Sequence, residues 1–347
     1  MTTMNWHRDL FRIQSGKMSV LLFVRVAIAV GAPLFALVLM GHVPAAVAAS
    51  ATAMFVTMSD IGVTRRGRIG TMAAATLVIL LGGYIGDEFG GTTGADEFFI
   101  LASAFIAGWV SNSHPAIAAI ARFGALATAA GAGMQVHDSM AAVAVLFGGF
   151  SAIAVAYAVW IIHDVPPDKD YIDWRVGVRR AFAGADAGVW FAVCYAGACA
   201  VSLLAADLIG LHSPYWATFA VIMVMRREGM VSFRLVSMYM LGTVAGVPAA
   251  ALLAALTTGD PLGHAAFATF AAAFARLGFA VNAALGYLAF TVFLIMVTEL
   301  ARGSAVPAWT LVLTRVYDVA VGCGLALIAT LLASLGNRPP AAQPGTA

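Results

Sequence analysis

Four arginines, Arg25, Arg122, Arg276 and Arg315, interrupt long apolar segments of this 347-residue chain. An ionised side chain in such surroundings is costly unless it faces water or a partner, so each is a candidate functional group. An arginine stays protonated and presents a planar fork of N–H donors that matches a carboxylate. Arginines that face one shared cavity would therefore form a binding site for an organic anion.

The four arginines differ in how deep they lie within their predicted segments. Arg25 and Arg276 lie within a turn or two of a predicted segment end, so we favour side chains that extend to the membrane surface. Arg122 lies deeper, where a structural and a substrate-binding role are equally open. All four are kept as candidate substrate-binding residues.

Two aspartates near arginines are candidates for coupling transport to protons. Asp318 follows Arg315 by three residues, so the two can pair on one helix face. An internal salt bridge is the favoured interpretation, and a protonatable coupling carboxylate is the alternative. Asp60 closes the second apolar segment beside Arg65 and Arg66, where capping or pairing is favoured over a proton relay.

Tyr215 and Trp216 stand at the start of the eighth apolar segment. Aromatic residues at such positions are typical of the belt at a membrane–water interface, which is the favoured interpretation. A gate or a stacking surface for an aromatic substrate is the alternative, so both residues join the candidate substrate-binding set.

The composition predicts a membrane protein. Hydrophobic residues make up 62% of the chain and charged residues 10%, and the mean hydropathy is +0.92. A net charge of +2 does not suggest a nucleic-acid partner. Cys194, Cys199 and Cys323 lie in apolar segments without the spacing of metal ligands, which indicates packing rather than a disulfide framework or a metal site.

Motifs for enzymatic or ATP-driven chemistry are not found in the sequence. It contains no G-x-x-x-x-G-K-[ST] loop, no H-E-x-x-H motif and no convincing Ser/His/Asp arrangement. We therefore expect neither an enzyme nor an ATPase, and no cofactor.

Hydropathy predicts an all-α polytopic membrane protein with about twelve transmembrane helices. The predicted segments are 19–40, 44–59, 70–87, 96–112, 114–134, 140–163, 187–209, 214–226, 236–257, 263–280, 282–300 and 310–335. The short second and eighth segments are expected to be steep or partly re-entrant.

A polar stretch near the midpoint divides the chain into two halves. The predicted organisation is an N-terminal segment 1–18, a first six-helix repeat 19–163, a linker 164–186, a second six-helix repeat 187–335 and a disordered tail 336–347. Because six is an even number, both halves run the same way through the membrane and form a parallel repeat.

The basic residues predict the orientation. If the N-terminus lies in the cytoplasm, most positive charges fall on the cytoplasmic side. They belong to the N-terminal segment, the loops around Arg65 and Arg226, and the linker. Arg302 is the clear exception. Both termini are therefore expected in the cytoplasm, with the chain in a bacterial inner membrane.

One stretch resembles the fusaric acid resistance family. It comprises His212-Ser213-Pro214-Tyr215-Trp216-Ala217, then Arg226-Arg227-Glu228-Gly229 and Arg234, then Gly242-Thr243-Val244-Ala245-Gly246. The end of the chain is similar to the closing helices of that family through Tyr287, Thr291, Arg315, Asp318 and Gly322. The first half matches more loosely, through Arg25, Asp60, Gly62 and the arginine loop.

The resemblance covers most of residues 18–335 and is most specific over 212–246. It implies a bacterial inner-membrane exporter of aromatic carboxylic acids, related in fold to plant malate-permeable anion channels. Two features depart from the family. The linker is short where larger members carry a soluble domain, and Tyr195 stands opposite Arg25, where an arginine is usual.

These observations predict a transporter that exports aromatic or other organic carboxylate anions, driven by a proton gradient or the membrane potential. Its site is expected near the interface between the halves, with Tyr215 and Trp216 on the outer side. A passive organic-anion channel and a non-transporting membrane scaffold or envelope-biogenesis protein are the alternatives. The resemblance alone implies a periplasmic adaptor and an outer-membrane channel as partners, and a homo-oligomer is a further candidate assembly.

Overall fold

The computed structural model describes residues 19–62, 64–92, 94–134, 140–163, 176, 178–179, 188–210, 215–302 and 308–336. Within them the chain forms twelve α-helices and one 3-10 turn, without a strand. The helices are α2 (Val20–Leu39), α3 (Val43–Met58), α4 (Arg65–Phe89), α5 (Ala95–Trp109), α6 (Pro115–Met134), α7 (Ala141–Ile162), α9 (Val189–Ile209), α10 (Tyr215–Val224), α11 (Gly229–Leu256), α12 (Pro261–Val281), α13 (Ala283–Arg302) and α14 (Ala308–Gly336). The all-α prediction is confirmed.

Each predicted apolar segment overlaps one of these helices. In the described part of the chain, nine helices are long and apolar enough to cross a membrane. The predicted N-terminal segment 1–18, nearly all of the linker 164–186, and the tail from 337 lie outside the described residues.

Two helices begin earlier than hydropathy predicts. α4 begins at Arg65 instead of residue 70, where Thr64 caps it by accepting a hydrogen bond from the Gly67 N–H at 3.0 Å. α11 begins at Gly229 instead of residue 236, so Arg234 is helical. The arginines predicted to lie in a loop after Asp60 therefore occupy the first turn of α4. Hydropathy detects only the apolar part of a helix and misses a polar first turn.

The two short helices lie among other helices. α10 has 10 residues and is roughly 15 Å long, about half the thickness of a hydrocarbon core. Every residue from Ala217 to Val224 is buried, and α3 is buried along most of its length. A helix that is apolar all round belongs in a protein interior. α10 therefore cannot cross the bilayer alone, and neighbouring helices cover it instead of lipid.

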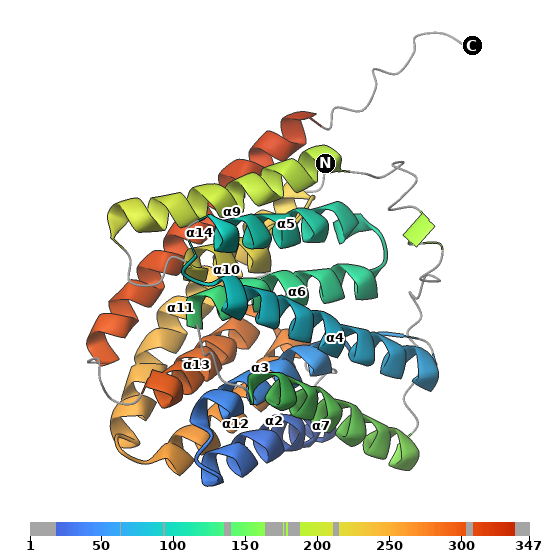
Figure 1. Cartoon of the computed structure of the whole chain (residues 1–347), viewed down its shortest axis with the longest axis vertical. Coiled ribbons are helices and arrows are strands. Elements are labelled where there is room, and N and C mark those ends of the chain that lie inside the picture. The colour runs from blue at the N-terminus through green and yellow to red at the C-terminus, as the bar shows by residue number, and fades with distance from the viewer. Residues whose placement is uncertain are drawn as a thin grey trace.

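The helix pairs follow a recurring pattern. α4 packs on α6 and α11 on α13, while α3 packs on α7 and α10 on α14. Four of the pairs join the predicted halves, because α5 packs on α9, α12 on α2, α10 on α6 and α13 on α3. Figure 1 shows α5 and α9 at one end of the long axis, and α2, α7 and α12 at the other. Helices α3, α6, α10 and α13 lie between these groups.

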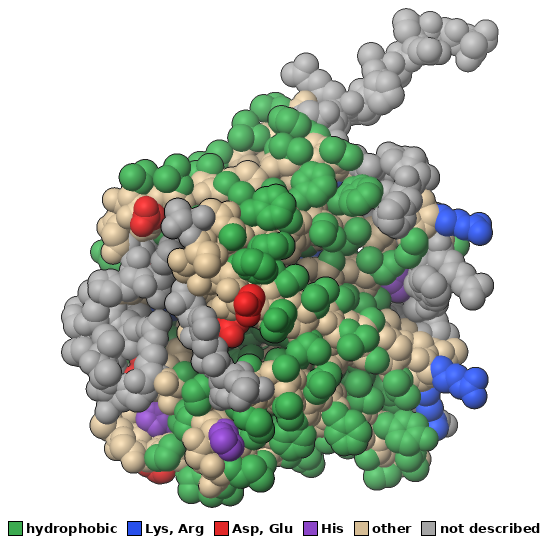
Figure 2. Space-filling model, viewed as in Figure 1, with side chains coloured by type: hydrophobic (Ala, Val, Ile, Leu, Met, Phe, Trp, Pro, Cys, Tyr) green, Lys and Arg blue, Asp and Glu red, His purple; other side chains and the backbone are tan. Residues whose placement is uncertain are grey.

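The two ends of the helices differ in charge. We call the end where α4 and α11 begin the arginine end, since it carries Arg65, Arg66, Arg68, Arg226 and Arg227. The end where α5 and α12 begin is the acidic end, with Asp87, Glu88, Asp96, Glu97 and Asp260. Figure 2 shows the described Lys and Arg side chains at the right-hand edge of the viewed face.

Candidate functional site

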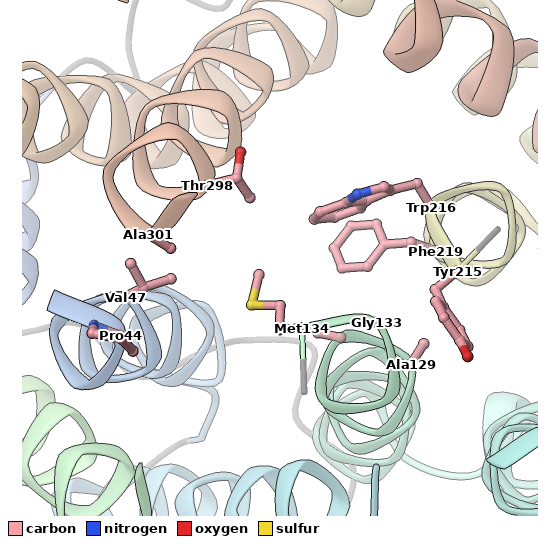
Figure 3. A pocket seen from close by; sticks show the side chains of 11 residues that line it. Pro44, Val47, Ala129, Gly133, Met134, Tyr215, Trp216, Phe219, Thr298 and Ala301 are labelled. Carbon is pink, nitrogen blue, oxygen red and sulfur yellow. The ribbon is translucent and has the colours of Figure 1, made fainter. Parts of the chain in front are cut away.

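A cavity of about 200 Å³ lies between four helices at the acidic end. Helices α3, α6, α10 and α13 supply its lining, which comprises Pro44, Val47, Ala129, Ala130, Gly133, Met134, Tyr215, Trp216, Phe219, Thr298 and Ala301. Figure 3 shows the rings of Trp216 and Phe219 beside the opening, with Met134 and Thr298 facing it. The lining is mainly apolar and includes three aromatic side chains, those of Tyr215, Trp216 and Phe219. Its chemistry suits an aromatic or other apolar group.

Tyr215 lines this cavity with its ring and is held by its hydroxyl group. The hydroxyl donates a hydrogen bond of 2.8 Å to Oδ2 of Asp96, which lies in the first turn of α5 and is only 5% exposed. The ring lies against Gly133 of α6, where an added Cβ would come within 2.9 Å of Tyr215 Cδ2. Both contacts fix the side chain between α5 and α6.

Tyr215 and Trp216 are both half-buried and border the inter-helix cavity. This position agrees with the alternative interpretation, a stacking surface for an aromatic substrate, and their place in an interface belt stays a prediction. A helix enclosed by others, such as α10, directs its terminal aromatics toward protein.

We expect Tyr215→Phe to lower the free energy of unfolding by about 1–3 kcal/mol, because it leaves a buried Asp96 oxygen without its donor. The measurement is thermal unfolding in detergent. Tyr157→Phe is the matched control, since Tyr157 is 49% exposed. An equal effect of the two substitutions would show that the Tyr215 hydroxyl contributes nothing specific.

Arg315 lies behind the cavity, against Trp216. Its guanidinium carbon is 3.7 Å from the centre of the indole ring, a cation–π contact. Arg315 is 7% exposed and Asp318 1% exposed, and Oδ1 of Asp318 has no hydrogen-bond partner among the described residues. Arg315 is not part of the cavity lining. It contacts and supports the ring of Trp216, which is part of the lining.

A chain of phenylalanines continues from the cavity toward the arginine end. Phe219 stacks on Phe290 with ring centres 6.3 Å apart, Phe290 contacts Phe55 at 6.1 Å, and Phe55 stacks on Phe123 at 5.0 Å. The four rings come from α10, α13, α3 and α6, the same helices that enclose the cavity. They fill the space between these helices with apolar rings.

Arg122 lies directly before Phe123 on α6 and belongs to a cluster with Arg226, Tyr195 and Tyr287. Arg122 lies within hydrogen-bonding reach of the Tyr195 hydroxyl, and the charges of both arginines act on Tyr195 and Tyr287. The Tyr195 hydroxyl also donates to the Ile222 carbonyl oxygen at 2.9 Å. We call these four residues the arginine–tyrosine cluster.

Arg226 follows the last turn of α10, and its position is fixed locally. Its Nη1 donates to the Met225 carbonyl oxygen at 2.7 Å, and its backbone N–H donates to the Ser232 hydroxyl at 2.8 Å. Burial, reinforced by the charge of Arg122, lowers the pKa of Arg226 to about 10. The group is therefore still protonated at neutral pH. Arg122 and Arg226 are both half-buried, so solvent reaches both.

Arg25 and Asp60 form a third group at the arginine end. Arg25 Nη1 and Asp60 Oδ2 are 2.6 Å apart, and Arg68 Nη1 lies 3.5 Å from Asp60 Oδ1. Arg276, on α12, interacts electrostatically with Asp60 and Arg25. Arg25 is 8% exposed, so the prediction that its side chain extends to the surface is wrong. The carboxylate of Asp60 holds it inside instead.

The structure thus distributes the predicted site residues over three places. Arg122 joins Arg226, Arg315 joins Trp216 near Tyr215, and Arg25 joins Arg276 and Asp60. The four intramembrane arginines do not share one cavity. Among the described residues, no group of three or more His, Cys, Asp or Glu side chains could hold a metal ion.

Sequence reasoning missed Arg226, Phe219 and Asp96 as site residues. Arg226 was interpreted as a topological charge, but it directly follows a run with no polar face, which is the pattern of an enclosed helix. Nothing in the sequence distinguished Asp96 from the other acidic residues at the acidic end. Its role follows from the contact with Tyr215.

Comparison with known proteins gives one match, over residues 199–329, to the family model described as "Fusaric acid resistance protein-like". The matched segment includes Tyr215, Trp216, Arg226, Arg315 and Asp318. No curated protein and no solved structure matches the chain. Over these residues the match agrees with the family resemblance seen in the sequence.

Proposed function

We infer that this multi-pass membrane protein is a transporter that exports organic carboxylate anions, aromatic ones in particular. The inference starts from its apolar helices and from the match of residues 199–329 to the fusaric acid resistance-like proteins. The observation that carries this proposal is the pair of half-buried arginines, Arg122 and Arg226. Among the described groups that act on Arg226 are Arg122, Tyr195 and Tyr287, and none of these three is acidic.

The chemistry of the cluster suits a carboxylate. Two guanidinium groups supply charge-assisted donors, and the hydroxyl groups of Tyr195 and Tyr287 lie within their electrostatic reach. Placing two positive charges together in the protein interior is unfavourable unless an anion joins them. In this proposal the substrate carboxylate is that anion, and it enters from the arginine end.

The aromatic residues complete the proposed path. A substrate leaving Arg122 meets Phe123, Phe55, Phe290 and Phe219 in turn, and then the cavity beside Trp216. The aromatic ring of a substrate can exchange its contact with one phenylalanine for a contact with the next. A hydrated ion, in contrast, loses its bound water in these apolar surroundings. If the phenylalanine side chains moved aside one after another, they would connect the arginine end with the acidic end.

The finer architecture belongs to the same proposal. The correspondence between the α4–α6 and α11–α13 pairs, and between α5–α9 and α12–α2, supports a parallel repeat of two six-helix halves. We place the arginine end and both termini in the cytoplasm of a bacterial cell, by the positive-inside rule. A proton gradient or the membrane potential would drive export, with Asp318 and Asp60 as coupling candidates. A periplasmic adaptor and an outer-membrane channel are proposed partners.

Direct transport measurement tests this function. The purified chain is reconstituted in liposomes, and the efflux of a panel of aromatic and aliphatic carboxylic acids is followed with and without an imposed proton gradient or potential. We expect gradient-dependent movement of aromatic acids. Absence of movement for every acid, at verified insertion, would favour the scaffold alternative. Currents in a planar bilayer at rates beyond those of an alternating-access carrier would favour the passive channel.

A further inference from the structure

A second group of charges lies apart from the arginine–tyrosine cluster, where α12 of the second half packs on α2 of the first half. Asp60 follows α3 and is the acidic member, and Arg25 of α2, Arg68 of α4 and Arg276 of α12 are the basic members. Arg25 also lies over the ring of Trp160, with the guanidinium carbon 5.6 Å from the ring centre. We call these five residues the Asp60 cluster.

Donors exceed acceptors in this cluster. Oδ2 of Asp60 accepts from Nη1 of Arg25, and Oδ1 faces Arg68 at 3.5 Å without a hydrogen bond. Four buried nitrogens have no hydrogen-bond partner among the described residues: Nε and Nη2 of Arg25, Nε of Arg276 and Nε1 of Trp160. A buried N–H without an acceptor is unfavourable, so four in one place indicate a missing acceptor.

The charges of the cluster also indicate a missing acceptor. Arg25 and Arg276 both interact with the one carboxylate of Asp60, so positive charge exceeds negative charge among these three groups, in a region where Arg25 is 8% and Trp160 0% exposed. Buried charges are ordinarily paired, because the desolvation of an unpaired ion is not recovered. An anion bound among the arginines would supply both the acceptor atoms and the countercharge.

The free edge of Arg25 indicates which kind of anion fits. Nη1 is used by Asp60, while Nε and Nη2 together form the other edge of the planar group. Two parallel N–H donors match two oxygens of one oxyanion. Arg68 and Arg276 are half-buried, so the cluster reaches the surface on their side.

We propose that the Asp60 cluster is a binding site for one oxyanion, a phosphate group taken either from solution or from a lipid headgroup at the arginine end. Binding requires a small outward shift of Arg276 or Arg68, because the free nitrogens of Arg25 are covered in this conformation. The anion then bridges Arg25 and Arg276 and ties α2 to α12. The site stabilises the packing of α12 of the second half on α2 of the first half, and it does not depend on the proposed transport function.

The unfolding temperature of the delipidated protein in neutral detergent tests the site. Phosphate is titrated against chloride at equal ionic strength, and in parallel phosphatidylglycerol is added and its adducts are counted by native mass spectrometry, with phosphatidylcholine as the comparison lipid. We expect one of these two sources to stabilise the wild-type chain with a saturating dose dependence. In Arg276→Gln the apparent affinity should fall at least tenfold, because one charge-assisted partner is lost.

Arg66→Gln is the matched control, since it removes one positive charge from the same end at an exposed residue outside the cluster. It should keep the full response. If Arg276→Gln does not fold, Arg276→Lys replaces it, which keeps the charge but loses the planar fork, and a weakened response is expected. A response to inorganic phosphate assigns a soluble ligand, and a response to phosphatidylglycerol alone assigns a lipid. No response to either source, or equal loss in Arg66→Gln and Arg276→Gln, overturns the proposal.

Discussion

Replacing Arg122 with alanine is expected to reduce carboxylate export by roughly 10- to 100-fold at equal expression. A hydrogen bond to a charged group contributes about 1.5–3 kcal/mol, and each 1.4 kcal/mol is about a factor of ten. Arg122 is one of two arginines in the arginine–tyrosine cluster, so its removal halves the positive charge there. The measurement is growth protection of a host sensitised to aromatic acids, followed by efflux from liposomes.

Controls separate this role from general effects of charge. Arg66→Ala removes an exposed arginine from the same end and should leave export unchanged. Arg315→Ala loses the support of Trp216 and should weaken export less than Arg122→Ala does. Arg226→Ala should act like Arg122→Ala, and the double variant should lose less than the sum, because both act on one carboxylate. Unchanged resistance in Arg122→Ala and Arg226→Ala would exclude the site.

Gly322→Val is expected to prevent stable folding, with a loss of about 3 kcal/mol or more, at the upper end of what overpacking costs. A Cβ added at Gly322 of α14 would lie 2.2 Å from the carbonyl oxygen of Ala217 on α10. Gly148 of α7 stands in the same relation to α3, with its Cβ 2.1 Å from the Ala49 oxygen. In both places a backbone atom, which cannot rotate away, occupies the space. The two helices can only separate.

The matched control lies two residues further along the same helix. A Cβ added at Gly324 meets nothing within 4 Å, so Gly324→Val should fold with close to wild-type stability. Thermal unfolding in detergent and the yield of monodisperse protein measure the difference. Equal behaviour of Gly322→Val and Gly324→Val would show that α10 and α14 are not in close contact in the membrane.

The positions of the helices followed closely from the sequence. A membrane interior requires every backbone polar group to be satisfied within the segment, so an apolar run of sufficient length can only be helical. Each helix from α2 to α14 lies within a few residues of its predicted segment, except where α4 and α11 extend into polar first turns. The extension of α4 depends on local capping by Thr64, which hydropathy does not measure.

The candidate site was predictable only in its residue types. Arginine, tyrosine and tryptophan in apolar segments predicted an anion site with aromatic surfaces, and the proposed path includes Arg122 at one end and Tyr215 and Trp216 at the other. The sequence could not show that Arg315 supports an indole ring or that Arg25 pairs with Asp60, 35 positions away. It also could not show that Arg226 lies beside Arg122, because these contacts join helices that are distant in the chain.

The sequence by itself indicated a membrane environment, the positions of the helices and a family resemblance over residues 199–329, because hydrophobic runs and short motifs are local properties of the chain. The tertiary structure decided which ionisable groups meet. Four arginines that look equivalent in sequence separate into an arginine–tyrosine cluster, a support for Trp216 and an arginine-rich group around Asp60. The physical reason is that α3 and α10 are short and enclosed, so the groups at their ends face neighbouring helices, and the neighbours are fixed only by packing.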